Sequence, residues 1–287
     1  MPAHDKTASD QFDIGLALGG GAVKGLAHIG LLKLLDKHKL KPSHISGTSM
    51  GAIIGALYAV GLSGLDIENR VKEYLVGSGK KSANIYKRSN QLFKWMKIFR
   101  YEKNQGGLVT AEGLFTHFFD ELNDIEFDDL NCNFSCSATD FNRGTEVALR
   151  HGKVLEAVQA SMAVPGVFAP VYKRIDDTQT CLVDGGLVNN LPTNHIQESD
   201  FLIASDVISV PNNRKPKTLE AANGAVNIML HYATARALEQ CPVDILHTID
   251  TNGIEAFDFH KIDDVLALGD EAAMALEPRL LKALKTK

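Results

Sequence analysis

The sequence predicts an α/β protein with a mostly parallel central sheet flanked by helices, interrupted by one helical, basic insertion. Three observations favour this class. A short apolar run, a glycine-rich turn and a helical pattern follow one another twice within residues 14–61. A further, strongly apolar run covers residues 201–210, and helical stretches are expected at about 221–240 and 263–284. Strands that alternate with helices are typical of a parallel sheet.

The first strand–turn–helix unit begins with Ile14–Leu18, which we expect to be a short buried strand. Gly19–Gly21 form the turn, and a helix is predicted over about residues 23–39, ending before Pro42. Its apolar residues fall on one stripe, which is the face expected to pack on the sheet: Leu26, Ile29, Leu32 and Leu35.

The second unit carries the motif G-x-S-x-G, written here Gly47-Thr48-Ser49-Met50-Gly51. It lies between a strand predicted near residues 44–46 and a helix that ends at Gly61. In this context the motif indicates a nucleophile elbow, in which a serine occupies a strained turn and its neighbours must be small. A serine that only caps the helix, followed by small packing residues, is the alternative, and the motif alone does not decide between them.

The basic insertion covers about residues 80–107. Within it, apolar residues and basic residues separate onto two helical faces, with Leu92, Trp95, Met96 and Phe99 on one and Lys94, Lys97 and Arg100 on the other. Two interpretations stay open. The segment Lys80–Lys103 is either a cap packed over the site, with its lysines solvated, or an interfacial helix that contacts an anionic membrane.

The second half of the chain continues the same pattern of strands and helices. Expected elements are strands at 134–140 and 146–150 around the turn Asn142–Gly144, a helix at 154–162, and strands near Val171, 181–183 and 201–210. No stretch outside the insertion resembles a linker. We therefore expect a single domain over residues 1–287, with a core at about 14–210 and a C-terminal helical region at about 221–287.

The composition of the chain argues against several classes of function. The chain has 287 residues, 45% hydrophobic content and a net charge of −5, which argues against a general nucleic-acid-binding protein. Its four cysteines show no metal-ligand spacing, and no calcium motif is present, so we expect no metal and no cofactor. The polar N-terminus lacks the apolar core of a signal peptide, and no window reaches the roughly 20 apolar residues of a membrane span. We expect a cytoplasmic protein, peripheral to the inner membrane face at most, with unknown oligomeric state.

The glycine-rich turn does not fit a phosphate-binding loop. A dinucleotide fingerprint G-x-G-x-x-G would need glycine where Lys24 stands, and the spacing reaches Gly25 only with one extra residue. The next strand ends without the carboxylate that binds ribose. A P-loop starting at Gly20 fails because Leu26 follows Gly25 in place of lysine.

Consecutive glycines before a helix can instead turn several N–H groups toward one point. Attack by a serine on an ester creates a negative oxygen that needs such donors. Because neighbouring parallel strands end at one edge of the sheet, Gly19–Gly21 and Ser49 are expected to meet there. A serine nucleophile also needs a base to accept its proton. The candidate is Asp184 in "CLVDGG", where it ends a predicted strand before Gly185-Gly186. Taken alone, that carboxylate is most simply part of an ordinary Asp-Gly turn.

These motifs, in this order, resemble the patatin-like phospholipases. The resemblance covers about residues 14–210 and rests on five stretches: "LALGGGAVKGLAHIGLLKLL", "ISGTSMGAIIGALYAVG", "SATDFNRG", "ASMAVPGVFAP" and "DGGLVNNLP". The C-terminal "FDFHKIDDVLALGDEAA" is similar to the bacterial members. The resemblance implies a patatin-like three-layer sandwich and a serine acyl hydrolase of phospholipase A or lysophospholipase type, acting on lipid or lipid-like esters.

The resemblance also implies a catalytic dyad, with Ser49 as nucleophile and Asp184 as base. The oxyanion hole would come from the amides of Gly19, Gly20, Gly21 and Met50. Supporting positions are Lys24, Gly25, Gly47, Gly51, Gly185 and Gly186. The chain departs from the family at Lys24, where many members carry arginine, and at Ala22, where they carry a further glycine. Lysine keeps the charge but not the planar fork of arginine, so the geometry of the loop is the part in question.

Two other functions stay open. An α/β-hydrolase triad has the chain order Ser, Asp, His, and four histidines follow Asp184: His195, His231, His247 and His260. A non-catalytic lipid-binding scaffold could keep the fold without turnover. A serine-reactive probe distinguishes the scaffold from an enzyme, and replacing each histidine distinguishes the triad from the dyad.

Overall fold

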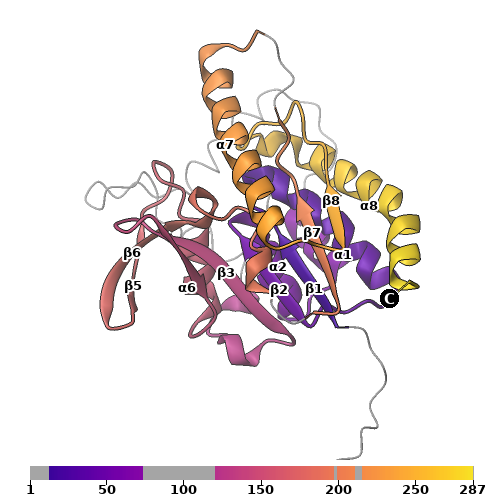
Figure 1. Cartoon of the computed structure of the whole chain (residues 1–287), viewed down its shortest axis with the longest axis horizontal. Coiled ribbons are helices and arrows are strands. Elements are labelled where there is room, and N and C mark those ends of the chain that lie inside the picture. Colours follow the sequence, from indigo (N-terminus) through magenta and orange to yellow (C-terminus); the bar gives the residue numbers. More distant parts are fainter. Residues whose placement is uncertain (1–12, 74–119, 197–198, 211–214, 287) are drawn as a thin grey trace, which may run out of the picture.

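The protein is described from a computed structural model, which covers residues 13–73, 120–196, 199–210 and 215–286. Its centre is an eight-stranded mixed sheet with helices on both faces, as the sequence predicts (Figure 1). The strands are β1 (Ile14–Leu18), β2 (His44–Thr48), β3 (Asn133–Asp140), β4 (Thr145–Leu149), β5 (Val171–Ile175), β6 (Thr178–Asp184), β7 (Phe201–Asp206) and β8 (Ile245–Thr248). They lie in the order β5-β6-β3-β2-β1-β7-β8, and β4 pairs with β3.

The middle of the sheet is parallel. β1 lies between β2 and β7, and β3 and β8 extend the parallel part on either side. All five residues of β1 are buried, since helices cover both faces there. Alternation divides the strand between two clusters: Leu16 and Leu18 belong to the larger core, and Ala17 to a smaller one on the opposite face.

Helices α1 (His28–Lys37), α2 (Met50–Ala59) and α8 (Ile262–Leu284) pack into the larger core. α1 and α8 approach so closely that a Cβ at Gly30 would lie 2.2 Å from the Gly269 carbonyl oxygen. Helix α7 (Thr218–Gln240) lies over the other face, where its Leu238 contacts the smaller cluster (Figure 1). The two remaining α-helices in the described ranges are α3 (Gly64–Val71) and α6 (Val154–Ser161).

The antiparallel edge brings two strand ends together. Residues Asn133–Ser137 of β3 pair with β2, and Cys136–Asp140 pair with β4, so β2 and β4 lie on opposite sides of β3. β6 pairs with Ala138–Asp140 of β3, and β4 pairs with the same residues from one side of β3. β6 must therefore lie on the other side of β3, which is the side of β2. Because β6 is antiparallel to β3, its last residue is the one nearest to the end of β2. The last residue of β2 is opposite Ser137, and the last of β6 is opposite Ala138.

Several elements differ from the sequence-based expectation. The helix predicted over 23–39 starts as a 3₁₀ helix, η1 (Ala22–Ala27), before α1, and the apolar run 201–210 is a strand only to Asp206. α3 and β8 were not predicted. The basic insertion at about 80–107 lies outside the described residues. The single-domain organisation stays a prediction.

Candidate active site

Ser49 lies on the tight turn between β2 and α2, with φ 54° and ψ −119°. A positive φ is unusual for a residue with a side chain and indicates local strain at a functional turn. The flanking glycines permit it. A Cβ at Gly51 would lie 2.2 Å from the Leu18 carbonyl oxygen, and one at Gly47 would lie 2.5 Å from the Gly51 oxygen. The elbow geometry expected from the sequence is therefore present.

The Ser49 amide is anchored by a residue that the sequence analysis did not single out. Its N–H donates to Ser161 Oγ at 3.0 Å, and the Ser161 hydroxyl donates to the Ser137 carbonyl oxygen at 2.7 Å. Ser161 ends α6 and is fully buried. It belongs to the "ASMAVPGVFAP" stretch, whose likeness to the family was the one signal for it. This hydroxyl connects the turn of Ser49 to strand β3.

Asp184 ends β6 beside the turn of Ser49, because the ends of β2 and β6 meet on the same side of β3. Its Oδ1 accepts the Gly186 N–H at 2.7 Å. Burial raises the pKa of this carboxyl to about 6, and the Ser49 hydroxyl and the Gly186 amide oppose the rise. Oδ2 is buried and accepts no hydrogen bond of normal geometry from a described residue. Because the Ser49 hydroxyl contributes to the pKa of this carboxyl, the two side chains lie close together.

The DGG turn is fixed against β3. A Cβ at Gly185 would lie 2.2 Å from the Ser137 carbonyl oxygen, and the Thr139 hydroxyl donates to the Asp184 carbonyl at 2.8 Å. The Asp184 N–H donates to the Ala163 oxygen at 3.0 Å. Ser49 and Asp184 are therefore connected to the same short part of β3, Ser49 through the Ser161 hydroxyl and Asp184 through the Thr139 hydroxyl.

The glycine-rich turn lies beside Ser49, since a Cβ at Gly20 would lie 3.3 Å from Ser49 Cβ. Two of its amides have other partners: the Gly19 N–H donates to the Ser205 oxygen and the Gly20 N–H to the Asn190 oxygen, both at 3.0 Å. Within the described residues, no hydrogen bond is formed by the amides of Gly21 and Met50. Of the four amides expected to bind the oxyanion, those of Gly21 and Met50 are therefore the two without a partner among the described residues.

Lys24 and Gly25 follow the glycine-rich turn and contact it and the start of α2. Lys24 is buried, and its burial lowers the pKa of the ammonium against the attraction of Glu255 and Asp258. Its N–H donates to the Gly21 oxygen at 3.1 Å. A Cβ at Gly25 would lie 2.7 Å from Met50 Cβ, so the glycine lets η1 pack against the first residue of α2.

A buried chain of polar groups lies behind the glycines. His28 Nε2 donates to the Gly19 oxygen at 2.8 Å, and Nδ1 lies 2.8 Å from Ser205 Oγ, which is 3.1 Å from His247 Nδ1. Burial lowers the pKa of His28 and His247 to about 4, so both rings are neutral at pH 7. His28 is fully buried and hydrogen-bonds to the Gly19 carbonyl, so it helps to fix the glycine-rich turn.

The histidines that the structure describes do not form a triad with Ser49. His195 bonds to Glu146 and Ser135, and His247 to Ser205. No histidine in the part of the chain that the structure describes forms a hydrogen bond with Ser49 or Asp184. The same part of the chain contains no cluster of three or more His, Cys, Asp or Glu side chains placed to hold a metal.

A serine on a strained strand-to-helix turn, next to a buried carboxylate at the edge of an α/β sheet, is typical of the serine hydrolases. Comparison with known proteins identifies the family within this class. Residues 16–195 match the sequence profile of the patatin-like phospholipases. The match covers more than half of the chain, which therefore belongs to the patatin-like phospholipase family.

Curated relatives agree with this assignment. Lysophospholipase nte1 of Aspergillus fumigatus is 28% identical over 202 residues, and lysophospholipase NTE1 of Candida glabrata is 27% identical over 213. These alignments cover 70% and 74% of this chain but only 12% and 11% of the relatives. The chain thus spans a small part of the length of the proteins it matches.

Solved structures share the fold. VipD from Legionella pneumophila aligns with a TM-score of 0.51 at 15% identity, over 95% of this chain and 67% of that chain. Human GIVD cytosolic phospholipase A2, in complex with methyl gamma-linolenyl fluorophosphonate, aligns with a TM-score of 0.50 at 13% identity. That alignment covers 98% of this chain and 60% of the human one. At these identities the likeness concerns the fold alone.

Proposed function

We propose that this protein hydrolyses carboxylic esters of lipids, with Ser49 as nucleophile and Asp184 as base. The observation that carries the proposal is the meeting of β2 and β6 on one side of β3, which sets a strained serine next to a buried carboxylate. Membership of the phospholipase family and the printed names of the lysophospholipase relatives support a lysophospholipid or phospholipid as the substrate class.

The reaction would proceed in two steps. Ser49 Oγ attacks the ester carbonyl carbon while its proton passes to the Asp184 carboxylate. The amides of Gly21 and Met50 donate to the resulting oxyanion. The ester C–O bond breaks, and Asp184 returns the proton to the departing alcohol. Water then attacks the acyl group, gives its proton to Asp184, and releases the fatty acid as Ser49 regains its hydrogen.

The environment of Asp184 suits this role. An exposed aspartate is a weak base, and burial brings the pKa of this one up to about 6. The carboxyl is then still ionised at pH 7 but closer to the working pH, where general bases are most effective. Oδ2, which accepts no regular hydrogen bond within the described chain, is the oxygen available to the Ser49 proton.

A fluorophosphonate probe tests the proposal against a non-catalytic lipid-binding scaffold. The wild type is expected to gain one probe adduct in intact mass, located on the peptide that contains Ser49, and Ser49→Ala to gain none. Products released by the wild type from a panel of phospholipids and lysophospholipids, identified by mass spectrometry, then define the ester that is cleaved. An unlabelled wild type that releases no fatty acid from any member of the panel would contradict the hydrolase proposal.

Contact with a lipid surface is part of this proposal. No described helix is both long and apolar enough to span a bilayer. The contact expected at Lys80–Lys103 lies outside the described residues and stays a proposal. Helix α7 offers a second surface: residues 221–235 contain no Asp, Glu, Lys or Arg, and Met229 and Tyr232 are 71% and 66% exposed. A Cβ at Gly186 would lie 3.7 Å from Leu230 Cδ2, so this uncharged surface borders the DGG turn.

Replacing Met229 and Tyr232 together by Asp is expected to weaken vesicle binding roughly tenfold or more, because two large apolar side chains would lose their lipid environment. Hydrolysis of a water-soluble short-chain ester should not change. Co-sedimentation with phosphatidylcholine vesicles measures the binding. Tyr172→Asp, at an equally exposed aromatic residue on β5, is the matched control. Equal vesicle binding by all three proteins would refute a lipid contact through α7.

A further inference from the structure

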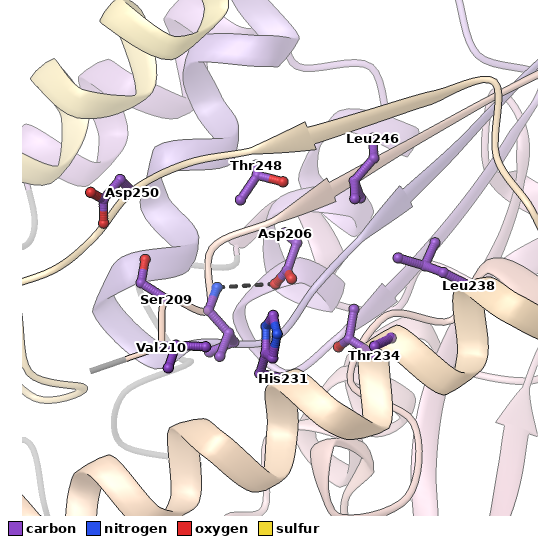
Figure 2. A pocket seen from close by; sticks show the side chains of 11 residues that line it. Asp206, Ser209, Val210, His231, Thr234, Leu238, Leu246, Thr248 and Asp250 are labelled. Atoms are coloured by element: carbon purple, nitrogen blue, oxygen red, sulfur yellow. Dashed lines mark hydrogen bonds between the residues drawn. The ribbon is translucent and has the colours of Figure 1, made fainter. Parts of the chain in front are cut away.

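A pocket lies between helix α7 and the ends of β7 and β8 (Figure 2). It has a volume of about 340 Å³, which is in the size range of small-molecule sites. Its walls are mainly apolar, formed by Ile208, Val210, Leu238 and Leu246 among others. The glycine-rich turn separates it from Ser49: a Cβ at Gly21 would lie 3.6 Å from Ile208 Cδ1, and one at Gly20 would lie 3.3 Å from Ser49 Cβ.

A buried carboxylate faces this pocket. Asp206 is the last residue of β7 and only 5% exposed. Its Oδ1 accepts the Ile208 N–H at 3.0 Å. Burial raises the pKa of this carboxyl, against the Ile208 and Val207 amides and the nearby His231 ring. Throughout the described ranges, no basic side chain comes within ion-pair distance of it, although buried carboxylates normally have such a partner.

A buried hydroxyl in the same pocket lacks a hydrogen-bond partner. Thr234 Oγ1 is fully buried and forms no hydrogen bond with any described residue, and the whole residue is 3% exposed. Thr234 lies on the same side of α7 as His231, three residues after it in the helix, and Figure 2 shows both beneath Asp206. Unpaired buried hydroxyls are rare in folded proteins and require an explanation, such as a ligand.

We propose that this pocket binds an alkylammonium, with its N–H groups donating to Asp206 and Thr234 and its hydrocarbon against the apolar walls. An anion does not fit, because Asp206 and Asp250 line the pocket and no described lysine or arginine does. A plain hydrocarbon would leave the Asp206 carboxylate without a cation and the Thr234 hydroxyl without a hydrogen bond in an apolar site. A divalent cation is disfavoured because Asp206 and Asp250 are the two described carboxylates that line the pocket, and the described residues contain no group of three or more His, Cys, Asp or Glu side chains placed to hold a metal.

The ammonium could come from a free alkylamine or from the headgroup of an aminolipid, since both present the same –NH₃⁺ group. Isothermal titration calorimetry with two probes distinguishes the sources. Hexylammonium represents the free amine, and an ether-linked lysophosphatidylethanolamine, which has no carboxylic ester to hydrolyse, represents the headgroup. Neither measurement requires turnover, so the result does not depend on the proposed hydrolase activity. Binding of either probe supports the proposal and identifies the source.

The decisive test compares the binding of a charged ligand with that of a neutral ligand of the same chain length. Hexylammonium is expected to bind at least about tenfold more tightly than hexanol, because hydrogen bonds to a charged group contribute more than neutral ones. Asp206→Asn should remove most of this preference. Thr234→Val, which keeps the shape, should weaken hexylammonium binding about threefold or more and leave hexanol binding unchanged.

Asp263→Asn, at an exposed acidic residue on α8, is the matched control and should bind like the wild type. Thermal unfolding of each variant establishes that it is folded. If Asp206→Asn fails to fold, Thr234→Val still tests the site. Equal affinity of the wild type for hexylammonium and hexanol, or unchanged selectivity in both variants, would overturn the proposal. Failure of both ammonium probes to bind would overturn it as well.

Discussion

Replacing Asp184 by Asn is expected to lower kcat/KM for an ester substrate by about 10²- to 10⁴-fold, the usual loss when a general base is removed. An amide is nearly isosteric with the carboxyl and can still accept the Gly186 N–H, so the turn should persist. It cannot accept the Ser49 proton. Initial rates on the lipid ester identified with the substrate panel measure the loss. An active Asp184→Asn variant would show that another group serves as the base.

The same substitution should stabilise the fold at high pH. Burial raises the pKa of Asp184 from 3.8 to about 6, so the native state binds this proton more tightly than the unfolded chain. The ionised carboxylate therefore destabilises the native state above pH 6, by about 3 kcal/mol for a shift of about two units. The penalty disappears as the pH falls below the unfolded value. The Asp184→Asn variant would avoid it at every pH, because its amide does not ionise.

Urea unfolding at pH 8 and pH 4 measures this difference. Asp184→Asn should be more stable than the wild type at pH 8 and about equally stable at pH 4. The wild-type kcat/KM should fall as the pH drops through about 6, because the base becomes protonated. Stability differences that are equal at both pH values would mean that ionisation of this carboxyl does not destabilise the native state.

Gly51→Ala is expected to have the largest effect on stability, about 3 kcal/mol or more, or to prevent folding. The new Cβ would lie 2.2 Å from the Leu18 oxygen and 2.6 Å from the Gly19 oxygen. Both atoms belong to backbone, which cannot rotate away as a side chain can. The helix α2 would have to move outward, and Ser49 with it. Urea unfolding at pH 7 measures the change in free energy.

Gly55→Ala, one turn later in α2, is the matched control. Its Cβ would meet only side-chain atoms, the nearest at 3.1 Å from Ile45 and Phe134, and these can shift slightly. We expect a much smaller loss of stability and a retained fluorophosphonate reaction. If the two alanine variants were equally stable, the close approach of α2 to β1 would not be what requires glycine at the elbow.

Local patterns predicted the parts of the fold that depend on neighbouring residues. Ile14–Leu18 is the predicted strand, and the elbow at Ser49 follows from the small residues that surround it. The start of α3 could also have been predicted from the sequence. Ser63 and Asp66 form a capping box, a recognised start signal that the sequence analysis did not use. β8 has only four residues, Ile245–Thr248, and its short alternation gives little signal by itself.

Pairings between distant segments were not predictable in this way. The sequence suggested that Gly19 and Gly20 would offer amides to an oxyanion, but both amides bond to carbonyls far along the chain, at Ser205 and Asn190. The role of Ser161 depends on the meeting of α6 with β2, which no local pattern encodes. Family resemblance pointed to these stretches without giving their contacts.

The arrangement around β3 has a consequence for how this chain can change length. The separation of Ser49 and Asp184 is set by two successive residues of one strand, Ser137 and Ala138, rather than by the loops that connect the motifs. Segments inserted before β3 or after β4 leave that spacing unaltered. Loss of one residue of β3 near Ser137 would instead turn the side chains of the following residues to the opposite face of the sheet. Relatives should therefore differ widely in their connecting loops while keeping this strand at constant length.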